Sequence, residues 1–154
     1  MPPPATCART TNGAIGIAQV GRLAGMLADR KQVAGYYREA LEPVATELGL
    51  GLPCEDTGGD ERGWFVWVVQ VPPGADRDET IRALRAHGVQ SKPYLPAIHL
   101  MSFYRERYGH RPGEFPVCED VAARSVALPF FPAMTESQVE RVTVALESVL
   151  RGAG

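Results

Sequence analysis

The sequence of 154 residues predicts a single α+β domain in which helices pack against a short sheet. Three observations favour this fold class. A long helical pattern of apolar residues occupies the first third of the chain, and a run of aromatic and β-branched residues follows it. A well-capped amphipathic helix is then expected near the C-terminus. The predicted order is long helix, strand, helix, strand, two helices, strand and helix, and no internal repeat is present.

The first predicted element is a long helix that begins after Asn12, a suitable N-cap. Its apolar residues recur at helical spacing, at Ile15, Val20, Leu23, Leu27, Ala34, Tyr37 and Leu41. Gly21 and Gly25 lie about one turn apart, and each costs a helix about 1 kcal/mol relative to alanine. We therefore expect another helix or a neighbouring chain to press on them; a weak helix with glycines of no consequence is the alternative. Pro43 is expected to end or bend this helix.

Residues 1–11 include three successive prolines and are expected to form a disordered or loosely tethered lead, so that the domain proper spans residues 12–151. After the long helix, residues 49–62 are rich in Gly, Asp and Glu and predict a loop. The segment "GWFVWVVQVP", residues 63–72, is apolar on both faces. This pattern predicts a central strand with helices or another layer on both sides.

The next helix is expected to begin at Asp76, with Ile81 and Leu84 facing inward and Gly88 ending it. Residues 89–96, "VQSKPYLP", then predict an extended path, because a residue before proline avoids helical geometry.

The C-terminal third predicts three helices and a short strand. "SFYRERYG" forms a short helix closed by Gly109, and Pro116 begins a second one that runs to about Ser125. A short strand follows, before Pro129. The last helix is capped by Thr135 and Gln138, with a buried stripe formed by Val139, Val142, Leu146, Val149 and Leu150.

The composition is that of an ordinary globular protein, with 45% hydrophobic and 22% charged residues. A net charge of −2 without basic clusters argues against nucleic acid or an anionic membrane as partner. No apolar run is long enough for a membrane helix and no secretory signal is recognised, so a cytoplasmic location is expected. Cys7, Cys54 and Cys118 are widely spaced, which favours reduced thiols over a zinc or dithiol site.

Common catalytic and phosphate-binding motifs are not recognised in the sequence. His87, His99 and His110 are spaced by 12 and 11 residues, which does not suggest a shared metal site, and no metal is expected. His99 lies among apolar neighbours in a segment fixed by two prolines, so it is either a satisfied core histidine or a polar group directed at a ligand. Tyr94 could present its hydroxyl to the same space. Glu119 falls in the first turn of a helix, where the helix dipole favours an acid without any catalytic role.

Three segments together carry a resemblance to a known family: "NGAIGIAQVGRLAGMLADRKQVAGYYREAL", "SKPYLPAIHLMSFYRERYG" and "GEFPVCEDVAARSVALPFFPAMTESQVERV". Over residues 12–151 the chain resembles the C-terminal part of the DegT/DnrJ/StrS family of PLP-dependent sugar aminotransferases. The resemblance implies the small C-terminal domain of a type I PLP-dependent transferase, with a short, mostly antiparallel sheet. It also implies homodimers, nucleotide-linked keto-sugar substrates, and a place in polysaccharide or amino-sugar biosynthesis.

By this resemblance Tyr94 and His99 face the sugar substrate, and Arg9 is a candidate contact to the cofactor phosphate across a dimer. The chain has two lysines, Lys31 and Lys92, and neither stands in the sequence context of the family's Schiff-base lysine. No catalytic residue is therefore assigned, and pyridoxal phosphate (PLP) is not expected to bind this chain alone. We expect a truncated or split enzyme that is inactive alone and self-associates, with a separately encoded large domain as possible partner. The alternative is a non-catalytic sugar-nucleotide binding or dimerisation module derived from such an enzyme.

Overall fold

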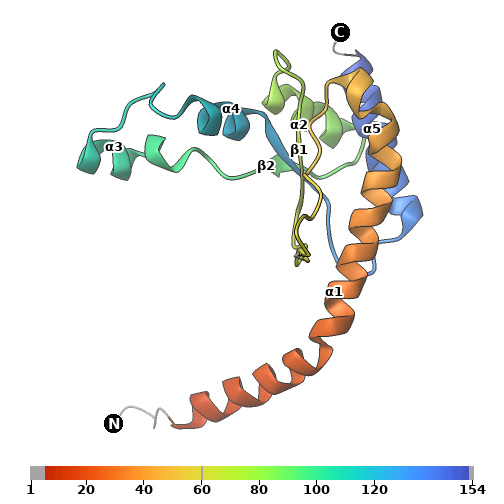
Figure 1. Ribbon diagram of the computed structural model, residues 1–154, viewed down its shortest axis with the longest axis vertical. Helices are drawn as coiled ribbons and strands as arrows, with labels where there is room; N and C mark the ends of the chain where they lie inside the picture. Colours follow the sequence, from red (N-terminus) through yellow and green to blue (C-terminus); the bar gives the residue numbers. More distant parts are fainter. Residues whose placement is uncertain (1–5, 60, 153–154) are drawn as a thin grey trace.

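The computed structural model describes residues 6–59 and 61–152, with side chains described from Gly13 onward. Figure 1 shows the arrangement of its helices and strands. The elements, in chain order, are α1 (Thr6–Leu48), β1 (Trp67–Gln70), α2 (Arg77–Ala86), β2 (Lys92–Pro93), the 3₁₀ helix η1 (Ile98–Leu100), α3 (Ser102–Tyr108), α4 (Pro116–Arg124), β3 (Ser125–Leu128) and α5 (Glu136–Gly152). The predicted α+β class and the predicted order of elements are confirmed.

The sheet has the strand order β1-β3-β2, and both pairs are antiparallel, as expected. β3 is therefore the central strand, and the prediction that the aromatic segment forms a central strand is wrong. β1 is at an edge, extended only by an isolated bridge between Gly51 and Gln70. Its two apolar faces have different surroundings: Trp67 and Val69 point into the core, whereas Val68 lines an open groove. Apolar residues on both faces therefore reflect a core and a groove rather than two covering layers.

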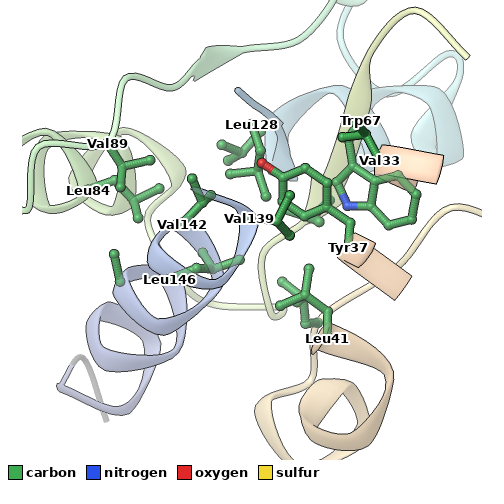
Figure 2. Packing of buried hydrophobic residues seen from close by; sticks show 14 of the residues in the cluster. Val33, Tyr37, Leu41, Trp67, Leu84, Val89, Leu128, Val139, Val142 and Leu146 are labelled. Atoms are coloured by element: carbon green, nitrogen blue, oxygen red, sulfur yellow. The ribbon is translucent and has the colours of Figure 1, made fainter. Parts of the chain in front are cut away.

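The core lies between the sheet and the helices α1, α2 and α5 (Figure 2). The ring of Tyr37 on α1 stacks on the indole of Trp67, with centroids 5.3 Å apart and planes inclined by 13°. The Tyr37 hydroxyl donates a hydrogen bond to the carbonyl of Pro129 at 2.6 Å, just beyond the end of β3. This residue thus connects α1 both to the edge strand and to the central strand.

Helix α5 packs along α1 and also contacts α2. Val139, Val142 and Leu146 are buried against these neighbours, as the sequence predicts. The predicted capping box is confirmed, because the Thr135 backbone N–H donates to Gln138 Oε1 at 2.9 Å and the Gln138 N–H donates to Thr135 Oγ1 at 3.3 Å.

The predicted limits of α2 are confirmed as well. Asp76 Oδ1 accepts hydrogen bonds from the backbone N–H groups of Asp78 and Glu79, at 2.8 and 2.9 Å, and so caps the first turn. Gly88 follows the helix with a positive φ of 76°, the conformation that ends many helices. Ile81 and Leu84 are buried. The helix is thereby fixed at both ends and along its inner face.

Helix α1 begins earlier than predicted, and Pro43 does not end it. Its backbone is helical from Thr6 rather than after Asn12, and it continues through Pro43 to Leu48. A proline inside a helix removes one backbone hydrogen bond, at a cost of about 3 kcal/mol. Buried Leu41 before Pro43, and half-buried Ala45 and Leu48 after it, pack on the same core, so tertiary packing holds the helix together across the proline. The division into a lead of residues 1–11 and a domain of residues 12–151 otherwise stays a prediction.

The N-terminal half of α1 extends away from the rest of the molecule (Figure 1). Gly21 and Gly25 lie there, and a Cβ at either position would meet open space. The expected close approach therefore does not come from the described part of this chain, and contact with a neighbouring chain stays a prediction. None of the helices formed by residues 6–59 and 61–152 combines the length and apolar character needed to cross a bilayer.

Candidate functional site

Tyr94 lies immediately after β2, where its backbone N–H donates to the Ser125 carbonyl at 3.2 Å and prolongs the pairing with β3. The half-buried residue lines a groove of roughly 530 Å³ on the face of the sheet that the helices of the core leave open. Most of this lining is apolar, and its members include Trp64, Phe65, Val66, Val68, Gln70, Val121 and Ser125. An apolar groove lined in part by a side chain with a hydroxyl group is typical of a small-molecule site.

His99 lies in η1, and its side chain is only 10% exposed. Its Nε2 atom lies 3.0 Å from Oε1 of Glu119. The ring meets that of Phe115 edge to face, with centroids 4.8 Å apart, and the centroid of the His110 ring is 6.0 Å away. His99 is not among the residues that line the Tyr94 groove. The structure therefore places the two predicted residues in the same half of the molecule but in different surroundings.

Glu119 holds the segment around His99 together. Its carboxylate accepts hydrogen bonds from the backbone N–H of Gly113, at 2.9 Å from each oxygen, and from that of Phe115 at 3.2 Å. The Gly113 N–H, followed by the hydrogen bond from His99, lowers the pKa of Glu119 below its ordinary value. Its carboxylate is therefore ionised at neutral pH.

The predicted position of Glu119 in the first turn of α4 is confirmed, but its bonds to His99 and to the preceding loop were missed. A sequence signal for part of this was present. Phe115 precedes the helix and cannot cap it with its side chain, and Pro116 at the first position has no N–H. An acid in the first turn is then placed to accept the N–H of Phe115, one residue later in the helix than the acid of a capping box.

His110 also lies near His99, although the spacing of the two histidines in the sequence gave no indication of this contact. Its Nδ1 atom lies 2.7 Å from Oε2 of Glu114, and the hydrogen bond from His110 lowers the pKa of Glu114. The chain turns back after Gly109, whose φ is 75°, and this reversal brings His110 beside His99. Among the described residues no three His, Cys, Asp or Glu side chains are placed to hold a metal ion.

The two lysines do not fit the role of a Schiff-base lysine. Lys31 Nζ lies 2.7 Å from Oε1 of Glu61 on the exposed side of α1, and this partner raises the pKa of Lys31, which favours the ammonium over the neutral amine that attacks a carbonyl. Lys92 is exposed on β2 and shares a groove with Arg85 and Phe130. No acidic side chain lines that groove among the described residues, so nothing there would pair with the pyridine nitrogen of PLP. Neither lysine is therefore placed to hold PLP within the part of the chain that the structure describes. The side chain of Arg9, the predicted phosphate contact, lies outside the described residues.

A family model of the DegT/DnrJ/EryC1/StrS aminotransferases matches residues 9–147. The chain belongs to this family. Its aminotransferases are PLP-dependent. The predicted family is thus confirmed.

Individual proteins and solved structures are also similar to this chain. The spore coat polysaccharide biosynthesis protein SpsC of Bacillus subtilis (strain 168) is 28% identical over 144 residues, which are 91% of this chain and 36% of SpsC. The crystal structure of the aminotransferase TlmJ from Streptoalloteichus hindustanus is similar with a TM-score of 0.77 and 26% identity, over 91% of this chain and 36% of TlmJ. A DegT/DnrJ/EryC1/StrS aminotransferase from Brucella abortus has the same fold, with a TM-score of 0.70 and 24% identity over 86% of this chain and 33% of that one. The chain spans about a third of the length of these relatives.

Proposed function

We propose that this chain forms the C-terminal, substrate-facing domain of an aminotransferase that acts on nucleotide-linked keto-sugars in polysaccharide or amino-sugar biosynthesis. The family match over residues 9–147 carries the proposal, and the naming of SpsC as a polysaccharide biosynthesis protein supports the pathway class. The groove around Tyr94 supports the substrate-facing role, because it lies on the face of the sheet that the core helices leave open.

In this proposal the groove binds the ring of the substrate. Trp64, Val66 and Val68 offer apolar surface for a sugar or base, and the guanidinium of Arg62 lies 4.6 Å from the centroid of the Trp64 ring. The Tyr94 hydroxyl supplies a polar contact that fixes orientation. His99, in η1, supplies a second polar contact from outside the groove. Neither residue is a proton-transfer catalyst in this proposal.

Binding is tested by calorimetry with a panel of nucleotide sugars. We expect the wild-type chain to bind at least one of them and Tyr94→Phe to bind it several-fold more weakly, because the hydroxyl contact is lost. Tyr104→Phe, on the exposed surface of α3, is the matched control and should bind like the wild type. Absence of heat with every member of the panel would contradict substrate binding by this domain.

We further propose that the chain does not transaminate by itself, because Lys31 and Lys92 are both unsuited to hold the cofactor. Addition of PLP should give no stoichiometric absorbance band of a lysine Schiff base, and Lys31→Ala and Lys92→Ala should leave the spectrum unchanged. A band that one of these substitutions abolishes would overturn the proposal. Activity is expected only when a lysine-bearing large domain of a family member is supplied.

A second candidate function is a dimerisation module. The observation that favours it is the exposed apolar side of the N-terminal half of α1, where Val20 is 71% and Leu23 47% exposed. Such a surface would serve either a large domain or a second copy of the chain. Sedimentation velocity, which measures self-association, distinguishes this candidate.

A further inference from the structure

The contact between His99 and Glu119 restricts the chemistry of the imidazole. A carboxylate can only accept hydrogen bonds, and both oxygens of Glu119 are already held by backbone donors from Gly113 and Phe115. Whatever atom approaches Oε1 at hydrogen-bond distance must therefore carry the proton. That atom is Nε2 of His99, at 3.0 Å. A neutral imidazole has a single ring proton, so a proton on Nε2 leaves Nδ1 without one.

The other ring nitrogen is free to meet a ligand. No hydrogen bond to Nδ1 of His99 is formed by any of the described residues. Two buried polar side-chain atoms without a partner occur in the described chain, Trp67 Nε1 and Ser91 Oγ, and Nδ1 of His99 is not one of them. Nδ1 is therefore not completely buried, although the side chain as a whole is only 10% exposed. An accessible, unprotonated nitrogen in a fixed ring is a hydrogen-bond acceptor of defined direction.

We propose that Glu119 is a positioning residue that holds His99 as the Nε2–H tautomer, so that Nδ1 accepts a hydrogen bond from a hydroxyl or N–H group of the bound sugar. The ligand part of this inference rests on the proposed function, in which His99 faces the substrate. The tautomer part is a property of the free chain. His99 then selects for a donor group on the ligand and against an acceptor such as a keto oxygen at that position.

His110 provides an internal reference of the opposite kind. Its Nδ1 atom faces the carboxylate of Glu114 at 2.7 Å, so the same reasoning places the ring proton of His110 on Nδ1. The chain has three histidines, and the remaining one is His87. It lies exposed at the end of α2 and is bound by no carboxylate among the described residues. The three imidazoles of this protein should thus show three different protonation patterns.

The test is a nuclear magnetic resonance experiment on the full chain with ¹⁵N-labelled histidine, at a pH above the ordinary imidazole pKa of about 6.5. We expect a slowly exchanging ring proton on Nε2 of His99, a ring proton on Nδ1 of His110, and averaged nitrogen signals for His87. His99→Gln and His110→Gln assign the signals. A proton on Nδ1 of His99, or averaged signals like those of His87, would overturn the inference without the need for any further variant.

Variants then connect the tautomer to its cause. Glu119→Ala should lose the slowly exchanging Nε2 proton and average the His99 signals, whereas the matched Glu114→Ala should change His110 and leave His99 as it is. Glu119→Gln keeps an acceptor oxygen and should retain part of the His99 pattern, a graded result that a general loss of structure would not give. An unchanged His99 pattern in folded Glu119→Ala would contradict the role of Glu119.

Addition of a nucleotide sugar separates the inference from the proposed function. A ligand donor bound to His99 should shift the Nδ1 resonance and leave Nε2 protonated. If the tautomer is found and no nucleotide sugar shifts Nδ1, the contact between the ligand and His99 fails while the positioning role of Glu119 stands; the proposed function itself fails only if no nucleotide sugar binds at all. If a ligand binds but Nδ1 carries the proton, the positioning role fails while the proposed function stands.

Discussion

At the scale of single residues, Tyr37 joins three parts of the core, and its hydroxyl is expected to contribute measurably to stability. Burial raises the pKa of this phenol, which therefore stays protonated and donates to the Pro129 carbonyl. Tyr37→Phe should lower the free energy of unfolding by about 1 kcal/mol, because a half-buried hydrogen bond is lost and a carbonyl loses its partner. Urea denaturation measures the change.

The control for Tyr37 is its neighbour on the same helix. The Tyr36 hydroxyl accepts a bond from the exposed Gln32 amide at 2.6 Å, where water can replace it. Tyr36→Phe should therefore change stability by less than about 0.5 kcal/mol. Equal effects of the two substitutions would show that the bond from Tyr37 to Pro129 contributes nothing beyond the loss of a hydroxyl.

A second residue, Glu119, should make stability depend on pH. Its pKa is lowered in the folded chain, chiefly by the Gly113 N–H and by the hydrogen bond from His99. The unfolded state therefore binds this proton at a higher pH than the folded state does, and the stabilisation by Glu119 is present above the ordinary glutamate pKa of about 4.3. It is lost as the pH falls through the lowered folded value.

The measurement compares wild type with Glu119→Gln by urea denaturation from neutral to acid pH. The difference in unfolding free energy should be largest at neutral pH and should shrink as the solution becomes more acidic. Glu140→Gln, on the exposed side of α5, is the control and should show a small difference that does not follow this course. A gap between wild type and Glu119→Gln that stays constant with pH would refute the expectation.

At the scale of elements, α5 depends on its buried stripe. Helix α5 contacts α1 and α2, and its Leu146 is fully buried, whereas Val144 on the same helix is 59% exposed. Leu146→Ala should lower the free energy of unfolding by about 3 kcal/mol, since it removes three buried carbon atoms and leaves a cavity. Val144→Ala should cost less than about 0.5 kcal/mol. The midpoints of urea denaturation give both changes in free energy, provided that the dependence of the unfolding free energy on urea concentration is unchanged. Similar losses for the two substitutions would contradict the packing of Leu146 in the core.

The elements that the sequence could predict are those whose ends and inner faces are marked locally. Asp76 and Gly88 mark the ends of α2, and Thr135 with Gln138 marks the start of α5; all four behave as expected. The wrong prediction that residues 63–72 form a central strand shows the limit of such reasoning. The order of strands in a sheet depends on pairing between segments that are distant in the sequence. A strand beside an apolar groove also carries apolar residues on both faces, just as a strand covered by helices on both sides does.

The candidate site was predictable only in part for the same reason. The resemblance directed attention to Tyr94 and His99; the structure places Tyr94 in the groove on the open sheet face and His99 against Glu119 and Phe115, outside the lining of that groove. The partnership of His99 with Glu119 spans 20 residues, and that of His99 with His110 depends on a chain reversal after Gly109. No spacing rule for a helix or a strand brings these residues together.

At the scale of the whole molecule, the apolar stripe of α1 continues beyond the body of the domain. Ala34, Tyr37 and Leu41 are buried, and the same side of the helix carries further apolar residues that remain exposed. These are Val20, Leu23 and Leu27, with exposures of 71%, 47% and 40%. We expect self-association through this side when no large domain is present.

Sedimentation velocity over a range of concentrations tests this expectation. The wild-type chain should sediment faster as the concentration rises, and the double variant Val20→Lys with Leu23→Lys should remain monomeric, because lysines oppose burial of the stripe. Val144→Lys places the same charge on an exposed apolar position elsewhere and should associate like the wild type. A wild-type chain that is monomeric throughout would contradict the expectation.

The lobe formed by η1, α3 and α4 contains no buried residue, whereas α2 and α5 each bury several. Hydrogen bonds from Arg124 to the Val71 carbonyl and to Gln70 Oε1, at 2.9 and 3.1 Å, attach it to the sheet, and the bonds to Glu119 hold it together internally. Such a lobe opens by local unfolding at a small fraction of the free energy that unfolds the core. Its amides should exchange with solvent deuterium well before those around Leu146, and a ligand seated on His99 should slow the Gly113 and Phe115 amides alone.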